Sequence, residues 1–214
     1  MTRSVLAILI ATIGAVACGG SAAAPPGLTA ANVAVQQGDL PSGLVRCDLT
    51  GDISSFIKQE QSPDPQTAKS TASSWSELQK SGATSAYVAL YTDSRARCSD
   101  IKSSASDPAA AVYRLVVNFV VQFKDEKSAV AGYKSDSSVF GFSASTLRSG
   151  GNAVQEGATT GLGPNSITLS RPVGNQTFFA AVWQNRAFMV ILVILNIDPA
   201  ASKKAATTEN ARIK

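Results

Sequence analysis

Hydrophobic and polar side chains alternate along the middle of the chain with the two-residue period of a β-strand. The clearest run is residues 112–123, in which the apolar face consists of Tyr113, Leu115, Val117, Phe119, Val121 and Phe123. The opposite face carries Arg114, Asn118 and Gln122. We therefore expect this strand to be half buried, with its second face turned to water.

A second apolar region predicts a hairpin, with strands at residues 177–184 and 186–197 that turn at Asn185 and Arg186. Positions 187–195 are all apolar, so we expect a central strand that is buried on both faces. This run is about half as long as the ~20 residues that a membrane-spanning helix needs. Further strands are expected at residues 85–92, 153–160 and 166–170.

Three segments are predicted to be helical, and an aspartate stands near the start of each. Asp64 and Asp198 are expected to cap their helices, and Asp125 is expected to lie in a first turn, where the helix dipole favours an acid. Two of these aspartates are followed by proline, which fits the first helical position. The segments are residues 68–80 after Asp64 and Pro65, residues 124–134, and residues 199–212 after Asp198. The serine- and glycine-rich stretch 135–152 is expected to be a loop.

This order of helices and strands predicts an α+β domain with two layers, in which helices pack on one face of a mostly antiparallel sheet. The whole chain has 214 residues. That length suits a single folded domain, which we expect at residues 37–214, behind a leader and a tether.

The leader begins with Arg3, continues with an apolar run at residues 5–16 and ends in small residues before Cys18. This pattern resembles a bacterial lipoprotein signal with its lipobox. The resemblance implies that residues 1–17 are a signal peptide and that Cys18 carries the lipid. Residues 18–36 are small and uncharged, which predicts a flexible tether.

Two alternatives use the same leader. One is an ordinary secretory signal, cut near Ala17 or at residues 22–24, so that Cys18 is lost or carries no lipid. The other is an uncleaved anchor, which the shortness of the apolar run disfavours.

Two cysteines, Cys47 and Cys98, remain once Cys18 is assigned to lipid. An even number of cysteines in an oxidising compartment predicts one disulfide. The bond would close a loop of about 50 residues and stabilise the fold by on the order of 4 kcal/mol. A redox-active thiol pair is the alternative, but the sequence holds no C-x-x-C motif.

The chain contains no histidine. This excludes Ser-His-Asp triads, Cys-His dyads and zinc sites built on imidazole. We find no G-x-S-x-G motif and expect no catalytic residue, no metal and no cofactor. The formal net charge of +4 is spread along the chain, so we expect no nucleic-acid partner.

Aromatic residues give the one candidate binding site. Trp183 lies on the predicted hairpin near Phe179 and Phe188, and Trp75 lies on the first long helix. These side chains either fill the core or line an apolar groove for a small or lipid-like ligand. The groove is a hypothesis motivated by the strand at 186–197, since both of its faces need cover.

Several elements together are similar to the extracytoplasmic domains of mycobacterial LpqN-type lipoproteins and of PknH-type kinase sensors. They are the opening at residues 39–43, the strand-to-helix passage at residues 123–126, the turn at 161–163, the hairpin at 182–186 and the closing helix after Asp198. The resemblance implies a PsbP-like or sensor-like fold and a non-enzymatic role. It transfers no functional residue, because no site motif matches.

The sequence thus predicts a lipoprotein on the outer face of the bacterial cytoplasmic membrane. Its domain is expected to bind a small or lipid-like apolar ligand. The alternative is a structural or protein-interaction role as an accessory subunit of a cell-envelope complex.

Overall fold

The computed structural model describes residues 27–103, 112–135 and 137–214. The expected signal peptide, residues 1–17, and the expected lipidation site Cys18 lie outside these residues.

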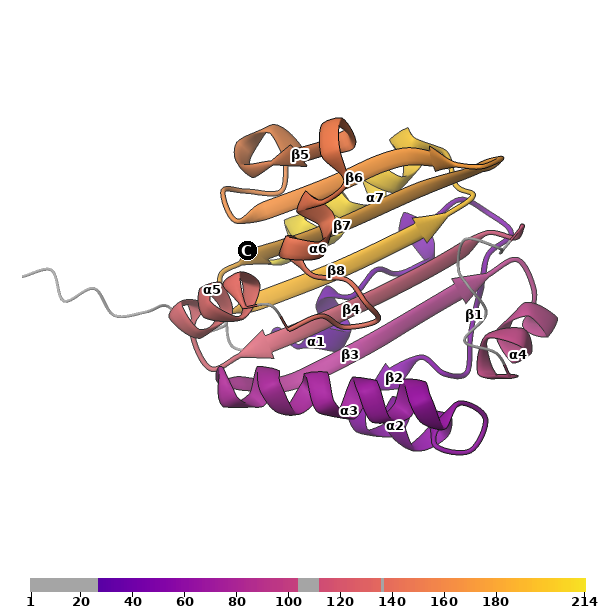
Figure 1. Cartoon of the computed structure of the whole chain (residues 1–214), viewed down its shortest axis with the longest axis horizontal. Helices are drawn as coiled ribbons and strands as arrows, with labels where there is room; N and C mark the ends of the chain where they lie inside the picture. The colour runs from indigo at the N-terminus through magenta and orange to yellow at the C-terminus, as the bar shows by residue number, and fades with distance from the viewer. Residues whose placement is uncertain (1–26, 104–111, 136) are drawn as a thin grey trace, which may run out of the picture.

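In the described part of the chain, the strands form one eight-stranded antiparallel sheet with the order β1-β3-β4-β8-β7-β6-β5, and β2 pairs with β3 (Figure 1). The strands are β1 (Val45–Arg46), β2 (Gly51–Asp52), β3 (Ala83–Thr92), β4 (Leu115–Phe123), β5 (Val154–Glu156), β6 (Ser166–Val173), β7 (Gln176–Asn185) and β8 (Phe188–Leu195). β8 lies between β4 and β7, which confirms the prediction of a central strand. The predicted hairpin turns at Arg186, where φ is +48°.

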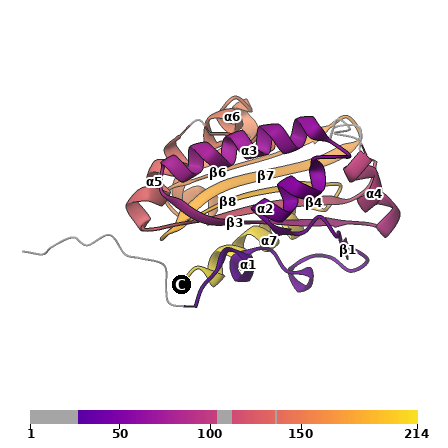
Figure 2. The ribbon, with the colours of Figure 1, turned by 90° about the horizontal axis from the view of Figure 1, so that it is seen from below.

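Helices cover both sides of this sheet. The α-helices are α1 (Ala30–Val33), α2 (Ile53–Glu60), α3 (Pro65–Lys80), α4 (Arg95–Ser103), α5 (Glu126–Lys134), α6 (Ala144–Arg148) and α7 (Pro199–Arg212), with short 3-10 turns at Gln37–Asp39, Gly151–Ala153 and Gly157–Thr160. Figure 2 shows α3, α2 and α6 above the sheet and α1 and α7 below it. We call the first side, which α5 also covers, the α3 face, and the second side the α7 face.

The α+β class and the antiparallel sheet are confirmed, but the expectation that helices cover only one face is wrong. The reason lies in β4 and β8, which have buried apolar side chains on both faces of the sheet. Asn118 of β4, expected to face water, is fully buried on the α7 face. Its amide accepts a hydrogen bond from the backbone N–H of Val35 and donates to the carboxyl of Glu209 on α7. Asn118 can be buried because these hydrogen bonds satisfy the polar atoms of its side-chain amide.

The predicted caps at Asp64 and Asp198 are confirmed, whereas Asp125, expected within a first turn, is itself the cap of α5. The carboxylates of Asp64, Asp125 and Asp198 each accept a hydrogen bond from a backbone N–H in the first turn of α3, α5 and α7. The predicted loop at 135–152 contains a further helix, α6, which begins at a capping box formed by Ser143 and Thr146.

The N-terminal segment of the described chain corrects the expected tether. Ala30, Val33 and Val35 are buried against the α7 face, so the folded domain begins before residue 37. The phenol of Tyr91 donates a hydrogen bond to the carbonyl of Val35, and Arg212 of α7 forms an ion pair with Asp39. Small, uncharged residues suit a linker, but they also suit close packing, and here they pack.

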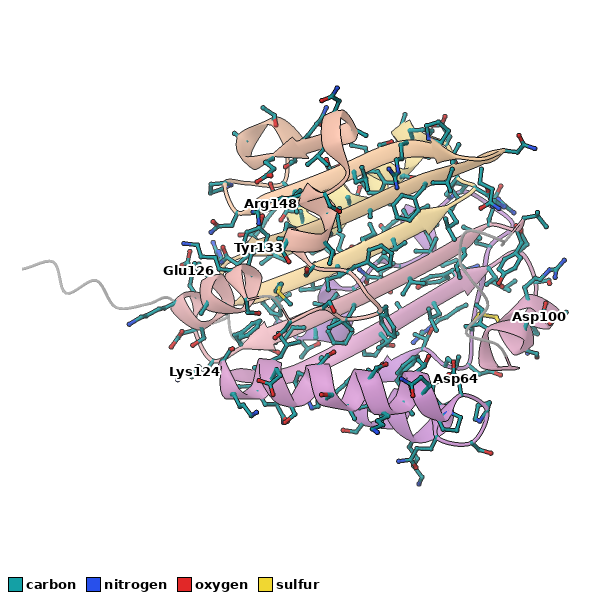
Figure 3. All side chains as sticks on the ribbon, in the orientation of Figure 1. Asp64, Asp100, Lys124, Glu126, Tyr133 and Arg148 are labelled. Carbon is teal, nitrogen blue, oxygen red and sulfur yellow. A yellow bond between two sulfur atoms is a disulfide. The ribbon has the colours of Figure 1, made fainter. Side chains whose placement is uncertain are left out.

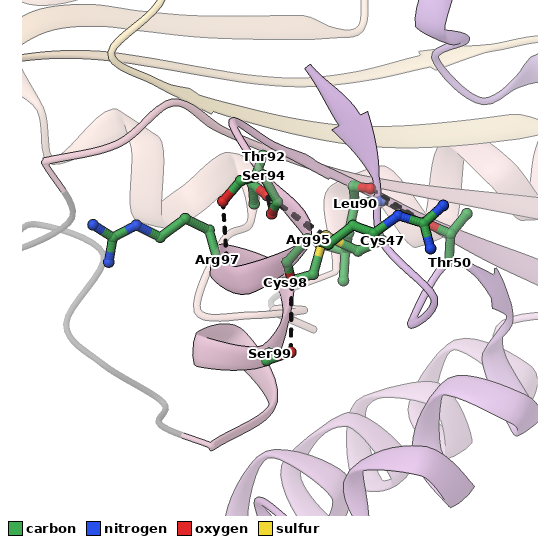
Figure 4. The surroundings of a disulfide bond; sticks show 9 residues. All are labelled: Cys47, Thr50, Leu90, Thr92, Ser94, Arg95, Arg97, Cys98 and Ser99. Carbon is green, nitrogen blue, oxygen red and sulfur yellow. Dashed lines mark hydrogen bonds between the residues drawn. A yellow bond between two sulfur atoms is a disulfide. The ribbon is translucent and has the colours of Figure 1, made fainter. Parts of the chain in front are cut away.

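A disulfide joins Cys47, which follows β1, to Cys98 of α4, as predicted (Figure 4). Both half-cystines belong to the buried cluster on the α3 face. The bond therefore ties α4 to the sheet edge formed by β1 and β3.

Candidate ligand-binding cleft

The predicted aromatic groove is wrong, because the structure does not bring its four residues together. Trp183 and Phe188 are fully buried in the centre of the α7 face, beneath α7 and the N-terminal segment. Phe179 is also buried there, and it lines a hollow of about 440 Å³ at the edge near β5 and β6. Trp75 packs against the opposite, α3 face.

A different hollow, of about 510 Å³, opens on the α3 face; we call it the cleft. Its floor is the end of the sheet where β4 begins and β8 ends, next to β3. The floor side chains are Leu90, Leu115, Val117, Val193 and Leu195. A volume of this size and an apolar floor are typical of sites that hold small organic ligands.

Two walls and one end enclose this floor. The first wall is the α2–α3 pair, which contributes Phe56, Glu60, Asp64, Thr67, Ser70 and Ser74. The second is the turn between α5 and α6, which contributes Ser138, Phe140, Gly141 and Phe142. Leu49, Ile101 and Tyr113 close the end near α4.

The second wall is a tight turn in a costly conformation. Val139 and Phe142 form a β-bridge, and between them Phe140 and Gly141 have φ values of +54° and +78°. Positive φ in both central positions is the geometry of a type I′ turn, which favours asparagine or glycine. For a bulky aromatic residue the left-handed conformation costs about 1–2 kcal/mol.

The Phe140 side chain compensates for this cost through aromatic contacts. Its ring packs edge-to-face against Phe56 of α2, with ring centroids 5.4 Å apart, and against Phe119 of β4 at 6.0 Å. The hydroxyl of Ser74 on α3 also donates a hydrogen bond of 2.7 Å to the carbonyl of Ser138. These contacts fix the turn against α2 and α3, which form the first wall. Residues in strained backbone conformations of this kind cluster at ligand sites.

Acceptor groups dominate the polar part of the cleft. The carboxylate of Asp64 accepts a hydrogen bond from the backbone N–H of Thr67. This bond, together with the Thr67 hydroxyl, holds the pKa of the Asp64 carboxyl below its usual range. Glu60 has only 2% of its surface exposed and lines the same wall. Among the described residues that line the cleft, none is a lysine or an arginine. The nearby guanidinium of Arg97 lies 5.0 Å from the ring centroid of Tyr113 and pairs with Asp100.

Sequence patterns predicted the strands that form the floor of the cleft but not the segments that form its walls. Leu115 and Val117 belong to the predicted apolar face of β4, and the two-faced burial of β8 was also expected. Phe140 lies in a stretch that was assigned to a loop, and its left-handed conformation has no sequence signal. The carboxylates Glu60 and Asp64 are separated from the floor in sequence, and only the α2–α3 turn brings them to it.

The described residues contain no group of three or more histidine, cysteine, aspartate or glutamate side chains placed to hold a metal ion. Within that same part of the chain, no helix has the length and apolarity needed to cross a membrane.

In sequence, the chain matches no protein-family model and no curated protein. In structure, it is similar to the extracellular domain of PknH from Mycobacterium tuberculosis, with a TM-score of 0.50 and 10% sequence identity. The match covers 86% of this chain and 93% of that domain. The two chains share an α+β fold in which helices pack on an antiparallel sheet.

Proposed function

We propose that this chain is a non-enzymatic extracytoplasmic lipoprotein, anchored through Cys18, whose cleft binds a small or lipid-like apolar ligand. The observation that carries the proposal is the cleft itself. The cleft is a hollow of about 510 Å³ with an apolar floor, and it stays open on one face of the sheet. The other face is covered by α7 and the N-terminal segment.

The shared fold supports an extracytoplasmic site of action, because the similar PknH domain is described as extracellular. The disulfide agrees with this placement, since such bonds persist in oxidising compartments. The leader before Cys18 supplies the reason to propose a lipid anchor.

A floor substitution tests ligand binding. Val117 is half-buried in β4 and lines the cleft, so Val117→Phe would fill part of its volume. We expect this variant to lose calorimetric binding of decyl glucoside, used below its micelle-forming concentration.

The matched control is Val173→Phe, because Val173 is also half-buried in a strand but lies outside the cleft, beside the β6–β7 turn. It should bind like the unchanged chain. Equal binding by both variants, or no binding by the unchanged chain, would contradict a ligand-binding cleft.

The anchor is tested in the producing cell. We expect globomycin to cause accumulation of the diacylated precursor, and Cys18→Ser to abolish incorporation of labelled palmitate. A Cys18→Ser chain that still incorporates palmitate would contradict lipidation at Cys18. The alternative role, as an accessory subunit of an envelope complex, predicts instead a discrete protein partner that copurifies with the chain and is retained by Val117→Phe.

A further inference from the structure

Most polar side chains of the cleft lie on the α2–α3 wall, with Ser138 on the second wall and Tyr113 at the end near α4, and the hydrogen bonds of the first wall indicate what a ligand must bring. The hydroxyl of Ser70 donates to the carbonyl of Thr67 at 3.1 Å, and that of Ser74 donates to the carbonyl of Ser138. Thr67 uses its backbone N–H and its hydroxyl on Asp64. The protons of these three hydroxyls are therefore committed within the protein, and lone pairs remain for a ligand.

Carboxylates add to this excess of acceptors. Asp64 and Glu60 both line the cleft, and an ionised carboxylate only accepts hydrogen bonds. Asp64 is charged at neutral pH, since the hydrogen bonds from Thr67 lower its pKa.

An anionic head group is disfavoured at the same wall. The N-terminus of α3 would attract an anion, but Asp64 already caps it and Pro65 removes one N–H donor. Lysine and arginine are also absent from the described lining, so its ionisable side chains other than Tyr113 are the carboxyls of Asp64 and Glu60, beside an apolar floor.

We propose that the cleft selects an amphiphile with a protonated amine head, seated at Asp64 and Glu60, and an apolar body that lies on the floor of β4 and β8. This inference rests on the proposed function, since it names the ligand class for the same cleft. Charge-assisted hydrogen bonds from an ammonium to carboxylates are stronger than neutral ones, and burial strengthens them further.

Three ligands with the same decyl chain separate head group from body: decylamine, which is protonated at neutral pH, decyl glucoside and decyl sulfate. Calorimetry on the full chain, below the micelle-forming concentration of each, should show decylamine binding tightest and decyl sulfate weakest. We expect roughly a tenfold preference for decylamine over decyl glucoside, the effect of one charge-assisted hydrogen bond.

Isosteric substitutions locate the source of this preference. Asp64→Asn keeps the helix cap but removes the charge, and Glu60→Gln replaces the second carboxyl by an amide of the same shape. Each should reduce the preference for decylamine several-fold and leave decyl glucoside unchanged.

The chain supplies a matched control for each variant. Asp125 caps α5 through the same first-turn hydrogen bond as Asp64, and Glu126 follows it, both outside the cleft. Figure 3 shows Glu126 at the opposite end of the sheet from Asp64. Asp125→Asn and Glu126→Gln should therefore keep the full preference for decylamine.

The outcomes distinguish this inference from the proposed function. If none of the three ligands binds, the ligand-binding function itself is contradicted. If decyl glucoside or decyl sulfate binds as tightly as decylamine, the function stands and the amine preference is overturned. The preference is also overturned if Asp64→Asn and Glu60→Gln behave like their controls.

Discussion

Both faces of the sheet carry apolar side chains, but they differ in how completely helices cover them. On the α7 face, Trp183, Phe188 and Val190 have no exposed surface. On the α3 face, Val117 of the same sheet remains half-exposed at the floor of a cleft. The difference therefore lies in what covers the strands and not in the strands themselves.

The covers differ in side-chain size and in spacing. α7 buries Ser202, Ala205 and Ala206, whose small side chains let the helix approach the sheet closely. On the α3 face, α2 and α3 cover the β3 side, whereas α5 and α6 cover the side toward β7 (Figure 1). The floor of the cleft is the part of β4 and β8 between these two groups of helices. The cleft thus lies where the two groups of helices on this face do not meet.

The largest effect is expected from truncation on the covered face. Trp183→Ala should lower the free energy of unfolding by about 3–5 kcal/mol, because it removes a fully buried indole. Phe140→Ala should cost less than half of this, since its ring is half-exposed at the cleft. Urea unfolding of both variants measures the difference.

A milder variant keeps this comparison measurable if Trp183→Ala does not fold. The indole N–H of Trp183 has no hydrogen-bond partner among the described residues. Trp183→Phe removes that buried donor and should therefore destabilise much less than Trp183→Ala. Equal costs for Phe140→Ala and Trp183→Ala would contradict the distinction between the faces.

The next largest effect concerns the disulfide, which holds the end of the α3 face. Replacing Cys47 and Cys98 together by alanine should lower the free energy of unfolding by about 4 kcal/mol, as expected for a loop of this length. Because α4 contributes Ile101 to the cleft, binding of decylamine should weaken as well. Thermal unfolding with and without ligand measures both effects, and unchanged affinity would show that α4 does not shape the cleft.

Two carboxyls give the two faces opposite responses to pH. Burial raises the pKa of Glu209 on the α7 face well above its ordinary value, although the amide of Asn118 opposes this shift. Its contribution to stability is complete below the ordinary pKa of a glutamate and is lost as the pH rises through the raised value. For Asp64, whose pKa is lowered, the contribution is present at higher pH and is lost as the pH falls through the lowered value.

The pH dependence of unfolding therefore separates the two groups. Glu209→Gln should remove a decline in stability toward higher pH, and Asp64→Asn should remove a decline on acidification. Denaturant unfolding across the pH range measures both slopes. A Glu209→Gln profile that matches the unchanged chain would contradict a raised pKa for the buried carboxyl on the α7 face.

The smallest effect is expected where the N-terminal segment is fastened. Arg212 pairs with Asp39 and donates to the carbonyls of Val33 and Ala34. Arg212→Ala should cost about 1.5–3 kcal/mol, the range for hydrogen bonds to a charged group. Hydrogen exchange should accelerate in residues 30–40 and stay unchanged in α2 and α3; acceleration on both faces would show that the two covers are not independent.

Local patterns predicted the parts of this fold that depend on neighbouring residues. The period-two run of β4, the two-faced β8 and the capping aspartates all express preferences within a few residues of chain. The cover of the α7 face was missed because Asn118 is satisfied by Val35 and Glu209, which are distant in sequence. The candidate site was misplaced for the same reason. The aromatic residues led to a groove predicted at Trp183, which is fully buried, whereas the cleft lies at Val117, where helices cover the sheet incompletely.

The central claim is that ligand binds on the α3 face and not on the α7 face. Titration of decylamine into isotopically labelled protein, followed by NMR of backbone amides and methyl groups, tests it directly. We predict that the largest shifts fall on Val117, Val193, Leu195 and the α2–α3 wall, whereas Val190, Leu192 and α7 stay nearly unchanged. Shifts concentrated on α7 and its strand neighbours, or no shifts at all, would contradict the claim.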